Sequence, residues 1–407
     1  MDILPEKVRI WQYVEKVTAA VSEKYGFSEI RFPTFENLDL FQRGVGDTTD
    51  VVQKEMYTLE TKGSGESRYA LRPEGTACIV RSIIENGLCH DAMPQKLRYN
   101  INCFRYEKPQ AGRYREFFQY GVEMFGADSP LADANVLSLA NEVIGALGIK
   151  GVTLHINSIG CPDCRPAYHS ALKEYFTAHK DELCDTCRER LEKNPLRILD
   201  CKSPICSAIA DGAPKTVDHL CEDCASHMDT LKQALNGLGV VYTVDPRIVR
   251  GLDYYTKTVF EFICPITGAA QSTICGGGRY DGLVKELGGP ALSGIGFAMG
   301  INRLIDAMEK SGVVIEDDNK PLLYIASMGA AASMRAFSVA ARFRAAGKYA
   351  ESDLVGRSLK AQMKYADKIG AQYTLILGDN ELETGCAQLK NMATGEQTAV
   401  EIDTFLI

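Results

Sequence analysis

The sequence lacks several features that would assign it at once to a common class of protein. No stretch approaches the roughly 20 consecutive apolar residues that a membrane-spanning helix needs. The formal net charge is −8, which argues against a generally basic nucleic-acid-binding protein but leaves room for a local basic surface. The chain also contains no internal repeat and no low-complexity segment, so a repeat architecture is excluded.

Two common phosphate-binding sequences are missing as well. The segment ICGGGRYDGLVKELGG (274–289) has three consecutive glycines at the end of an expected strand. No Gly-Lys-Ser or Gly-Lys-Thr follows them, and their spacing does not match the dinucleotide-binding fingerprint. Glycines at this place instead allow a ligand or another backbone to approach closely.

The composition is otherwise that of an ordinary globular protein. Hydrophobic residues make up 45% and charged residues 24% of the 407 residues, which is enough for a substantial core and for two or three domains. The N-terminal segment MDILPEKVRIWQYVEKV predicts an amphipathic helix with Pro5 near its start, not a signal peptide. We therefore expect a cytoplasmic protein without membrane association.

The expected strands and helices divide the chain into three parts. They alternate up to about residue 155, a helix-rich segment with many cysteines follows over 161–240, and strands return at Tyr242–Phe262. A pattern that is interrupted and then resumes indicates an insertion into one domain. The polar segment Glu309–Pro321 is predicted to be a linker, and the alternation after it predicts a small α/β domain.

Eight of the 14 cysteines are concentrated in the helix-rich segment. They form the pairs CPDC, CDTC and CEDC, with two further cysteines before the last pair. Thiolates two residues apart can share one tetrahedral zinc ion, whereas disulfides are typical of small secreted proteins. Zinc binding and a reduced insertion without metal are both open at this point. The candidate zinc ligands are Cys161, Cys164, Cys184, Cys187, Cys201, Cys206, Cys221 and Cys224.

Two segments combine charged residues with expected strands and turns. In LRPEGTA (71–77), Glu74 and Thr76 could hold a small cationic group, although a turn that leads into a helix explains the same residues. CFRYEKPQAGRYREFFQYGVEMFG (103–126) predicts two strands joined by an arginine-rich loop. Gln119 and Glu123 share one face of the second strand, which suits a polyanionic ligand with a polar head, while the alternative is a solvated hairpin.

Two further segments place arginines beside a sheet. RIVRGLDYYTKTVFEF (247–262) becomes a strand from Tyr255 onward, and its first residues bring Arg250 and two tyrosines together. SGIGFAMGINRLIDAM (293–308) predicts a glycine-rich strand that leads into a helix, with Arg303 placed to reach a phosphate.

Together these segments resemble the class II aminoacyl-tRNA synthetases, and specifically the histidyl-tRNA synthetase family, over nearly the whole chain. FPTFENLDLF, FRYEKPQAGRYREFFQYGVE and GFAMGINRL are similar to the three class II motifs, while RGLDYYTKTVFEF and CGGGRYDGL resemble the two histidine-specific ones. The resemblance implies an α+β fold: a catalytic core (1–160 and 241–310) with an antiparallel sheet and flanking helices, a helical cysteine-rich insertion (161–240), and a C-terminal α/β anticodon-binding domain (320–407).

The resemblance also implies roles for individual residues. Arg250 and Arg105 would be catalytic and meet the α-phosphate, Arg303 would meet the γ-phosphate, and the third motif departs from the family in having Asn302 where an acidic residue is usual. The histidine-binding residues would be Glu74, Thr76, Gln119, Glu123, Tyr254 and Tyr255. The ATP-binding residues would be Arg105, Arg113, Tyr114 and Arg303, and the residues at the tRNA acceptor end would be Lys108 and Gln110.

The implied reaction is the ATP-dependent activation of L-histidine, with Mg²⁺, and its transfer to histidine tRNA. The first motif implies a homodimer. The C-terminal domain would read the anticodon, and eight lysines or arginines between Ser333 and Gly370 fit this function because phosphates attract them. The alternative is a catalytically inactive synthetase-like regulatory subunit or sensor, which typically lacks the histidine-specific motifs or the C-terminal domain.

Overall fold

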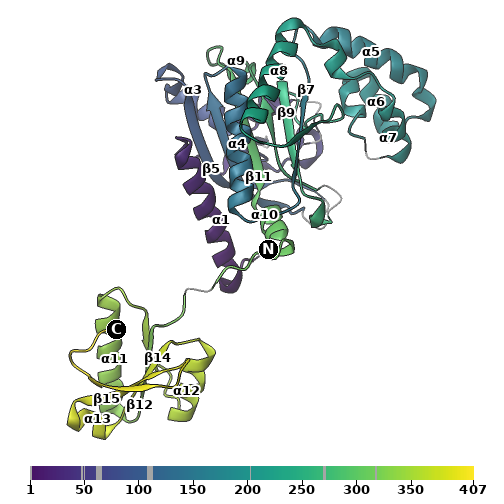
Figure 1. Ribbon diagram of the computed structural model, residues 1–407. Coiled ribbons are helices and arrows are strands. Elements are labelled where there is room, and N and C mark those ends of the chain that lie inside the picture. Colours follow the sequence, from purple (N-terminus) through teal and green to yellow (C-terminus); the bar gives the residue numbers. More distant parts are fainter. Residues whose placement is uncertain are drawn as a thin grey trace. The chain divides into compact units, whose positions relative to one another are not determined.

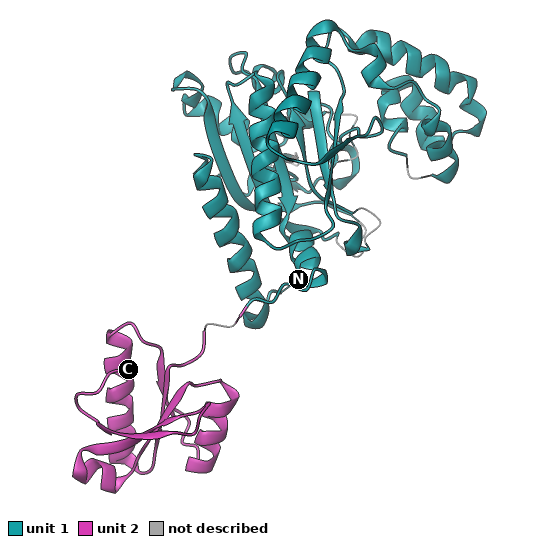
Figure 2. Cartoon of the chain, viewed as in Figure 1, with its two compact units in different colours: residues 1–315 teal, residues 316–407 magenta. Residues whose placement is uncertain are grey.

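The computed structural model describes residues 2–46, 49, 51–60, 67–107, 113–201, 203–268, 272–316 and 319–407. The chain forms two compact units, Met1–Ile315 and Glu316–Ile407 (Figures 1 and 2). The boundary between them falls inside the predicted linker. Lys108 and Gln110, which were expected at the tRNA acceptor end, lie outside the described residues. Among the described helices, none combines the length and the apolar character that crossing a membrane requires.

The first unit is built on an eight-stranded sheet with the strand order β1-β5-β6-β11-β10-β9-β7-β8. The strands from β5 to β7 in this order pair in antiparallel fashion, and the edge strands β1 and β8 are parallel to their neighbours. The expected antiparallel sheet is therefore confirmed. The strands are β1 Ser28–Glu29, β5 Gln95–Phe104, β6 Glu116–Phe125, β7 Thr153–Ser158, β8 Tyr242–Val244, β9 Thr256–Ile263, β10 Thr273–Arg279 and β11 Gly294–Gly300.

The largest hydrophobic core lies between this sheet and a layer of helices that includes α1 and α4 (Figure 1). Helix α4 begins where the Ser129 hydroxyl accepts a hydrogen bond from the backbone N–H of Leu131, and Pro130 occupies its first position. The helices of this layer are α1 Pro5–Lys24, α4 Pro130–Ala146, α8 Glu222–Gly237 and α10 Ile301–Lys310.

Helix α8 has a different place from the one that the cysteine pattern suggested. The expected insertion over 161–240 includes it, but Met228, Leu231 and Leu235 are buried in the main core. Their helical spacing puts them on one face of α8, so this helix covers the sheet beside α4. The insertion therefore leaves the core near Arg165 and returns to it at the start of α8.

The rest of the insertion forms a small helical lobe beside the sheet (Figure 1). Leu172, Phe176 and Leu191 belong to its separate hydrophobic core. Its helices are α5 Arg165–Ala178, α6 Asp185–Lys193 and α7 Pro204–Asp211, with short 3₁₀ turns at Lys180–Glu182, Pro195–Ile198 and Thr216–His219.

A second group of elements packs on the opposite face of the large sheet and forms further hydrophobic clusters there. Ile79, Val80 and Ile83 of α3 are buried there together with Tyr99 and Tyr280 from the large sheet. The elements of this region are β2 Phe35–Asn37, α2 Leu38–Val45, a π-helical turn Val51–Glu55, β3 Thr58–Glu60, β4 Ser67–Leu71, α3 Thr76–Glu85, a 3₁₀ turn Leu88–His90 and α9 Leu283–Glu286; a 3₁₀ turn at Pro265–Thr267 follows β9. Strands β2, β4 and β3 form a small antiparallel sheet.

The second unit is an α/β domain, as the sequence predicts. Its five-stranded sheet has the order β13-β12-β14-β15-β16, with the first three strands parallel and the last two antiparallel. Its elements are β12 Leu323–Ser327, α11 Ala330–Ala345, β13 Ala350–Ser352, α12 Leu359–Lys368, β14 Tyr373–Leu377, α13 Asp379–Thr384, β15 Cys386–Asn391 and β16 Gln397–Glu401.

Candidate active site

A cavity of about 560 Å³ opens on the face of the large sheet that carries Tyr99 and Tyr280. Its volume is typical of small-molecule sites in proteins. The cavity brings together every described residue for which the sequence predicts contact with histidine or ATP. These residues are Glu74, Thr76, Arg105, Arg113, Tyr114, Gln119, Glu123, Arg250, Tyr254, Tyr255 and Arg303.

Glycines on the central strands make room for the charged groups of this cavity. A Cβ atom at Gly276, the first of the three consecutive glycines on strand β10, would lie 2.4 Å from Nη2 of Arg250. A Cβ atom at Gly296 of β11, which pairs with Glu123 of β6, would lie 1.8 Å from the Oε2 atom of Glu123. A side chain at either position would displace a charged group, so these glycines keep the space that Arg250 and Glu123 occupy.

Glu123 is the most enclosed carboxylate of the site, with a relative exposure of 1%. Its Oε1 atom accepts hydrogen bonds from the hydroxyls of Thr76 at 2.8 Å and Tyr99 at 3.3 Å, and its Oε2 atom accepts one from Tyr280. Burial raises the pKa of Glu123 to about 8, against the effect of these donors. A buried acceptor held in this way can pair with one ring N–H of an imidazole.

Glu74 lies at the start of α3 and is also buried. Its carboxylate accepts hydrogen bonds from the backbone N–H groups of Thr76 at 2.7 Å and Ala77 at 2.8 Å, so it caps the helix. Burial raises the pKa of Glu74, and the Glu74 carboxylate adds to the burial that raises the pKa of Glu123. A cationic ligand group would relieve this accumulation of acidic groups.

Arg250 lies beside these acids and has its own anionic partner. Its Nη1 atom forms an ion pair with Glu261 of β9, whose other oxygen accepts a hydrogen bond from the Thr273 hydroxyl at 2.7 Å. Burial alone would lower the pKa of Arg250, but Glu261 and Tyr255 raise it above its ordinary value. The guanidinium group is thus held as a fixed cation, 6.0 Å from the centre of the Tyr255 ring.

Three further arginines converge on the other part of the cavity. Arg105 donates from Nε to the carbonyl oxygen of Pro73 at 2.9 Å, and Arg303 donates from Nη1 to the carbonyl oxygen of Thr273 at 2.7 Å. Arg113 forms an ion pair of 3.1 Å with Glu107. Burial lowers the pKa of Arg303, and the positive charges of Arg113 and Arg105 lower it further. Cations crowded in this way favour an anionic ligand.

The departure at Asn302 leaves this arrangement intact. Its side-chain oxygen accepts a hydrogen bond from the backbone N–H of Phe118 at 3.3 Å, which ties the start of α10 to β6. Gln119, on the same strand, accepts a hydrogen bond from the Cys103 thiol at 3.4 Å. Tyr254 and Tyr255, the adjacent tyrosines of the segment 247–262, lie against each other with ring centres 4.6 Å apart.

Three residues of the site do not follow from the sequence reasoning. Tyr280 and Glu261 lie inside the two histidine-specific motifs but were not assigned a role, although Glu261 alternates with the buried Phe260 and Phe262 and so must face the other side of the sheet. Tyr99 stands on β5 in an ordinary strand sequence. Tyr99 pairs with Gly121 of the neighbouring strand, and its ring lies over this glycine: a Cβ atom at Gly121 would lie 2.3 Å from the phenolic oxygen of Tyr99.

The eight candidate zinc ligands do not form one cluster. They separate into two sets of four, and within each set the sulfur atoms lie within 4.8 Å of one another. The first set is Cys161, Cys164, Cys221 and Cys224, and the second is Cys184, Cys187, Cys201 and Cys206.

The sequence and the fold both match known proteins. The family model described as histidyl-tRNA synthetase matches residues 1–164 and 206–304, and the model of an anticodon-binding domain matches residues 323–406. The histidine–tRNA ligase of Acetivibrio thermocellus is 53% identical over 405 residues, which cover 100% of this chain and 96% of that protein. The chain belongs to the histidyl-tRNA synthetase family.

Further relatives agree with this family assignment. The histidine–tRNA ligase of Clostridioides difficile is 48% identical over 406 residues and covers 100% of this chain and 96% of its own length. The crystal structure of apo Staphylococcus aureus histidyl-tRNA synthetase superimposes with a TM-score of 0.84 at 39% identity, with 99% of this chain and 96% of that chain covered. A Bacillus halodurans protein titled as an ATP phosphoribosyltransferase regulatory subunit/histidyl-tRNA synthetase shares the fold, with a TM-score of 0.66 at 22% identity; 93% of this chain and 96% of that chain are covered.

The raised pKa of Glu123 predicts how stability depends on pH. An unfolded glutamate ionises near pH 4.3, whereas the folded one keeps its proton up to a pKa of about 8. Between these values the folded state binds more protons, so the free energy of unfolding should fall as the pH rises from about 5 to about 8. Glu123→Gln cannot ionise and should flatten this decline.

Urea unfolding at several pH values measures the effect. Trp11 is the single tryptophan, and its ring packs 4.9 Å from that of Phe118, so its fluorescence reports on the first unit. The exposed replacement Glu309→Gln is a control that should retain the decline of the wild type. If Glu123→Gln shows the same slope as the wild type, the buried carboxyl does not carry the proton assigned to it.

Proposed function

We propose that this protein activates L-histidine with ATP to form histidyl-adenylate and then transfers the histidyl group to the 3′ end of histidine tRNA. One observation carries the proposal. A single cavity places the buried acids Glu74 and Glu123 close to four arginines, among which Arg250 and Arg303 both interact with Glu261. This combination suits an amino acid with a cationic head that meets a polyphosphate. The family membership and the histidine–tRNA ligase relatives support the same function.

Selection of histidine would depend on the enclosed carboxylate Glu123 and the tyrosines around it. The imidazole ring of histidine offers one donor and one acceptor nitrogen. Amino acids without such a ring leave Glu123 and the nearby hydroxyl of Tyr254 or Tyr255 unpaired in a buried place, which costs binding energy. Glu74, Thr76 and Gln119 would hold the α-ammonium group of the substrate.

Activation needs a positive environment for developing phosphate charge. A carboxylate oxygen of histidine attacks the α-phosphorus of ATP, the bond from this phosphorus to the bridging oxygen breaks, and pyrophosphate leaves with the electron pair. Arg250 and Arg105 would stabilise the charge on the α-phosphate, and Arg113, Tyr114 and Arg303 would bind the leaving part of ATP. These groups are fixed by their contacts in the protein before the substrate arrives.

ATP also brings Mg²⁺, which supplies additional positive charge to its phosphates. Oxygen ligands are the donors that this ion prefers, and the carboxylates of Glu107 and Glu261 line the same part of the cavity as Arg303. These two residues would hold the ion next to their arginine partners Arg113 and Arg250. In the second step the 3′-terminal ribose hydroxyl attacks the histidyl carbonyl, AMP leaves, and a phosphate oxygen of the adenylate accepts the hydroxyl proton.

The second unit would read the anticodon, although not with all the cations counted in the sequence. Arg342 donates to the carbonyl oxygens of Asp403 and Ile402, and Arg357 pairs with Asp353 at 2.7 Å, so both have structural roles. The exposed lysines and aromatic rings remain suited to phosphates and to bases. They are Lys348, Lys360, Lys364, Lys368, Phe337 and Tyr349. Lys108 and Gln110 stay a proposal for the acceptor end of the tRNA.

The first class II motif is the proposed dimer surface. Phe35 of β2 is 52% exposed and Tyr69 of β4 is 42% exposed, and their rings lie 5.8 Å apart. Aromatic residues are enriched at protein interfaces relative to the rest of the protein surface. A cytoplasmic location is proposed on the same basis as the function, because the tRNA substrate of protein synthesis is found there.

The reaction is tested first by pyrophosphate exchange. Purified protein with ATP, Mg²⁺ and labelled pyrophosphate should form labelled ATP only when L-histidine is added, because the other amino acids leave the buried acceptors unpaired. Charging of histidine tRNA should follow under the same conditions. No exchange by folded protein would favour the inactive regulatory subunit instead. Equal exchange with several amino acids would contradict the proposed selection of histidine.

Removal of the fixed cation tests the catalytic assignment. Arg250→Ala should slow histidine-dependent exchange by roughly 100-fold or more, because a preorganised donor to the developing charge is lost. The same change leaves Glu261 without its cation and should destabilise the fold. The double variant Arg250→Ala/Glu261→Gln removes the unpaired charge, so it should recover stability in urea unfolding but not exchange. Exchange near the wild-type rate in Arg250→Ala would show that this arginine is merely structural.

Replacement of one exposed ring tests the dimer surface. Phe35→Glu places a charge in the proposed contact and should shift the protein from dimer to monomer in sedimentation-velocity experiments. Leu131→Glu, on α4 at 60% exposure, is the matched control and should leave the dimer intact. A wild-type protein that sediments as a monomer at micromolar concentration would contradict the proposal.

A further inference from the structure

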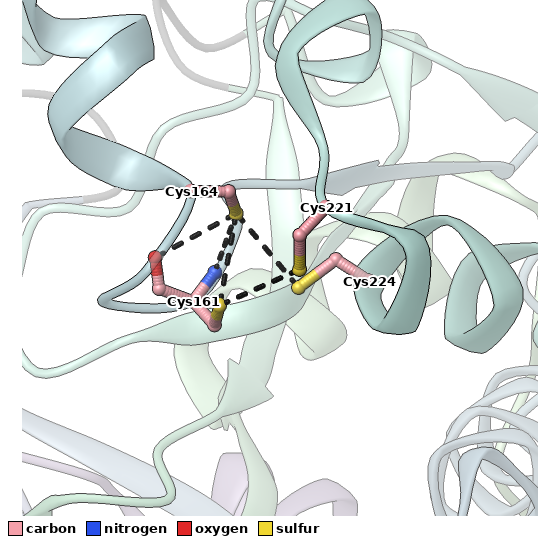
Figure 3. A group of neighbouring side chains, drawn as sticks. All are labelled: Cys161, Cys164, Cys221 and Cys224. Carbon is pink, nitrogen blue, oxygen red and sulfur yellow. Dashed lines mark hydrogen bonds between the residues drawn. The ribbon is translucent and has the colours of Figure 1, made fainter.

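The two sets of cysteines are nested in the sequence. We name them the outer set (Cys161, Cys164, Cys221 and Cys224) and the inner set (Cys184, Cys187, Cys201 and Cys206). The outer set joins the two ends of the insertion (Figure 3), whereas the inner set lies between them in the sequence. We propose that each set binds one structural zinc ion, and that the outer ion attaches the insertion to β9, the strand that follows Tyr254 and Tyr255.

The distances between sulfur atoms fit a tetrahedral ion. Four thiolates placed tetrahedrally at a Zn–S distance of about 2.3 Å have sulfur atoms about 3.8 Å apart. In the outer set, Cys161 Sγ lies 3.7 Å from both Cys164 Sγ and Cys221 Sγ, and Cys164 Sγ lies 3.9 Å from Cys224 Sγ (Figure 3). In the inner set, Cys184 Sγ and Cys201 Sγ are 3.9 Å apart. These separations are almost twice the length of a disulfide bond.

Several cysteines of both sets lie beside hydrogen-bond donors or at the N-termini of helices. Backbone N–H groups donate to the sulfur atoms of Cys164 at 3.2 Å and Cys206 at 3.3 Å. Such donors are typical partners of metal-bound sulfur. In addition, Cys164, Cys184 and Cys221 are the N-cap residues of α5, α6 and α8, where the helix dipole favours negative charge. These features support four thiolates and a divalent cation better than four neutral thiols.

The number and type of ligands indicate zinc in a structural role. Each set supplies four sulfur ligands, so no coordination position remains for water or substrate. Sulfur ligands in a tetrahedral arrangement select zinc or iron over Mg²⁺ and Ca²⁺. The cysteines of the inner set belong to a lobe whose core is small, and an ion adds stability that such a core cannot supply alone.

The outer set is connected to the substrate cavity from the first side of the insertion. Just before Cys161, the carbonyl oxygen of Gly160 accepts a hydrogen bond from Lys257 N–H at 2.9 Å. Just after Cys164, Arg165 Nη2 donates to the carbonyl oxygen of Tyr255 at 2.6 Å. The two bonds hold the first ligand pair against the residues that follow directly on Tyr254.

The second ligand pair is connected to the same strand through α8. Three residues beyond Cys224, the Nε2 atom of His227 lies 2.7 Å from Asp133 Oδ2 in the buried interior. The same carboxylate oxygen accepts a hydrogen bond from the hydroxyl of Thr258 at 2.6 Å. Both segments that supply ligands to the outer ion are therefore attached to the start of β9, next to Tyr254 and Tyr255.

The inner set has a different connection to the cavity. It holds the short stretch between α6 and α7, where Arg197 donates to Gly251 O at 2.7 Å and to Asp253 Oδ1 at 3.0 Å. Loss of the inner ion should loosen this stretch without releasing β9. Loss of the inner ion and loss of the outer ion should thus affect different segments, so the two sites can be tested separately.

Metal content of the full chain is the first test. Protein purified without a metal-affinity tag should contain about two zinc ions per chain by elemental mass spectrometry, one for each set. The outer variant Cys221→Ser/Cys224→Ser and the inner variant Cys184→Ser/Cys187→Ser should each contain about one. Cys386→Ser, exposed in the second unit, is the matched control and should keep both ions.

Hydrogen exchange followed by mass spectrometry is the second test. The outer variant alters neither Gly160 nor Arg165. The amides of Tyr255–Lys257 should nevertheless exchange roughly tenfold faster in it, because the outer ion no longer holds the insertion against the start of β9. The inner variant should show faster exchange in α6 and wild-type exchange at Tyr255–Lys257. Neither measurement uses enzymatic activity, so its outcome is independent of the proposed aminoacylation.

Several results would overturn the proposal. Folded wild type with little zinc would exclude both sites, and iron in place of zinc would exclude the assigned metal. Equal exchange at Tyr255–Lys257 in the two variants would exclude the proposed attachment of the outer ion to β9. If a variant does not fold, titration of wild-type thiols with a mercurial reagent replaces it: release of about one zinc ion per four thiols supports the sites, and release of none rejects them.

Discussion

The cavity depends on backbone that carries no side chains. At Gly276 and Gly296 the central strands leave the space that Arg250 and Glu123 occupy, and any other residue at either position would displace a charged group. A sheet with side chains there would present a filled surface, as the opposite face of the same sheet does against its helices. The antiparallel pairing of β10 with β11 brings these two positions into one area.

Charges placed in this space have partners inside the protein, because their side chains have little contact with solvent. Glu123 uses hydroxyl donors, whereas Arg250 uses the carboxylate of Glu261. Hydroxyl groups lower the cost of a buried carboxylate only in part, which explains why the pKa of Glu123 is still raised. One end of the site can therefore exchange a proton while the other stays cationic. A zwitterionic amino acid beside a polyphosphate is the ligand that such a division of charge accommodates.

The sequence predicts the sheet, the α/β second unit and most of the cavity, because each motif combines a strand pattern with polar residues in fixed positions. The sequence does not predict contacts between strands that are distant along the chain. Tyr99 looks like an ordinary strand residue until its pairing with Gly121 is known. The partition of the cysteines is equally hidden, since spacing alone allows neighbouring pairs to combine. Helix α8 was assigned to the insertion because Cys224 lies in it, although Leu231 and Leu235 attach it to the main core.

The nesting of the two cysteine sets has a consequence for the order in which the first unit assembles. Contacts within the inner set join residues 17 positions apart, such as Cys184 and Cys201, whereas the outer contact of Cys161 with Cys221 spans 60 positions. The entropy of loop closure makes the longer contact about 1 kcal/mol more costly to form from an open chain. Once the inner loop is closed, the effective length of the outer loop shrinks. Closure of the inner loop therefore lowers the entropic cost of joining the two ends of the lobe, and all four inner cysteines precede α8 in the chain.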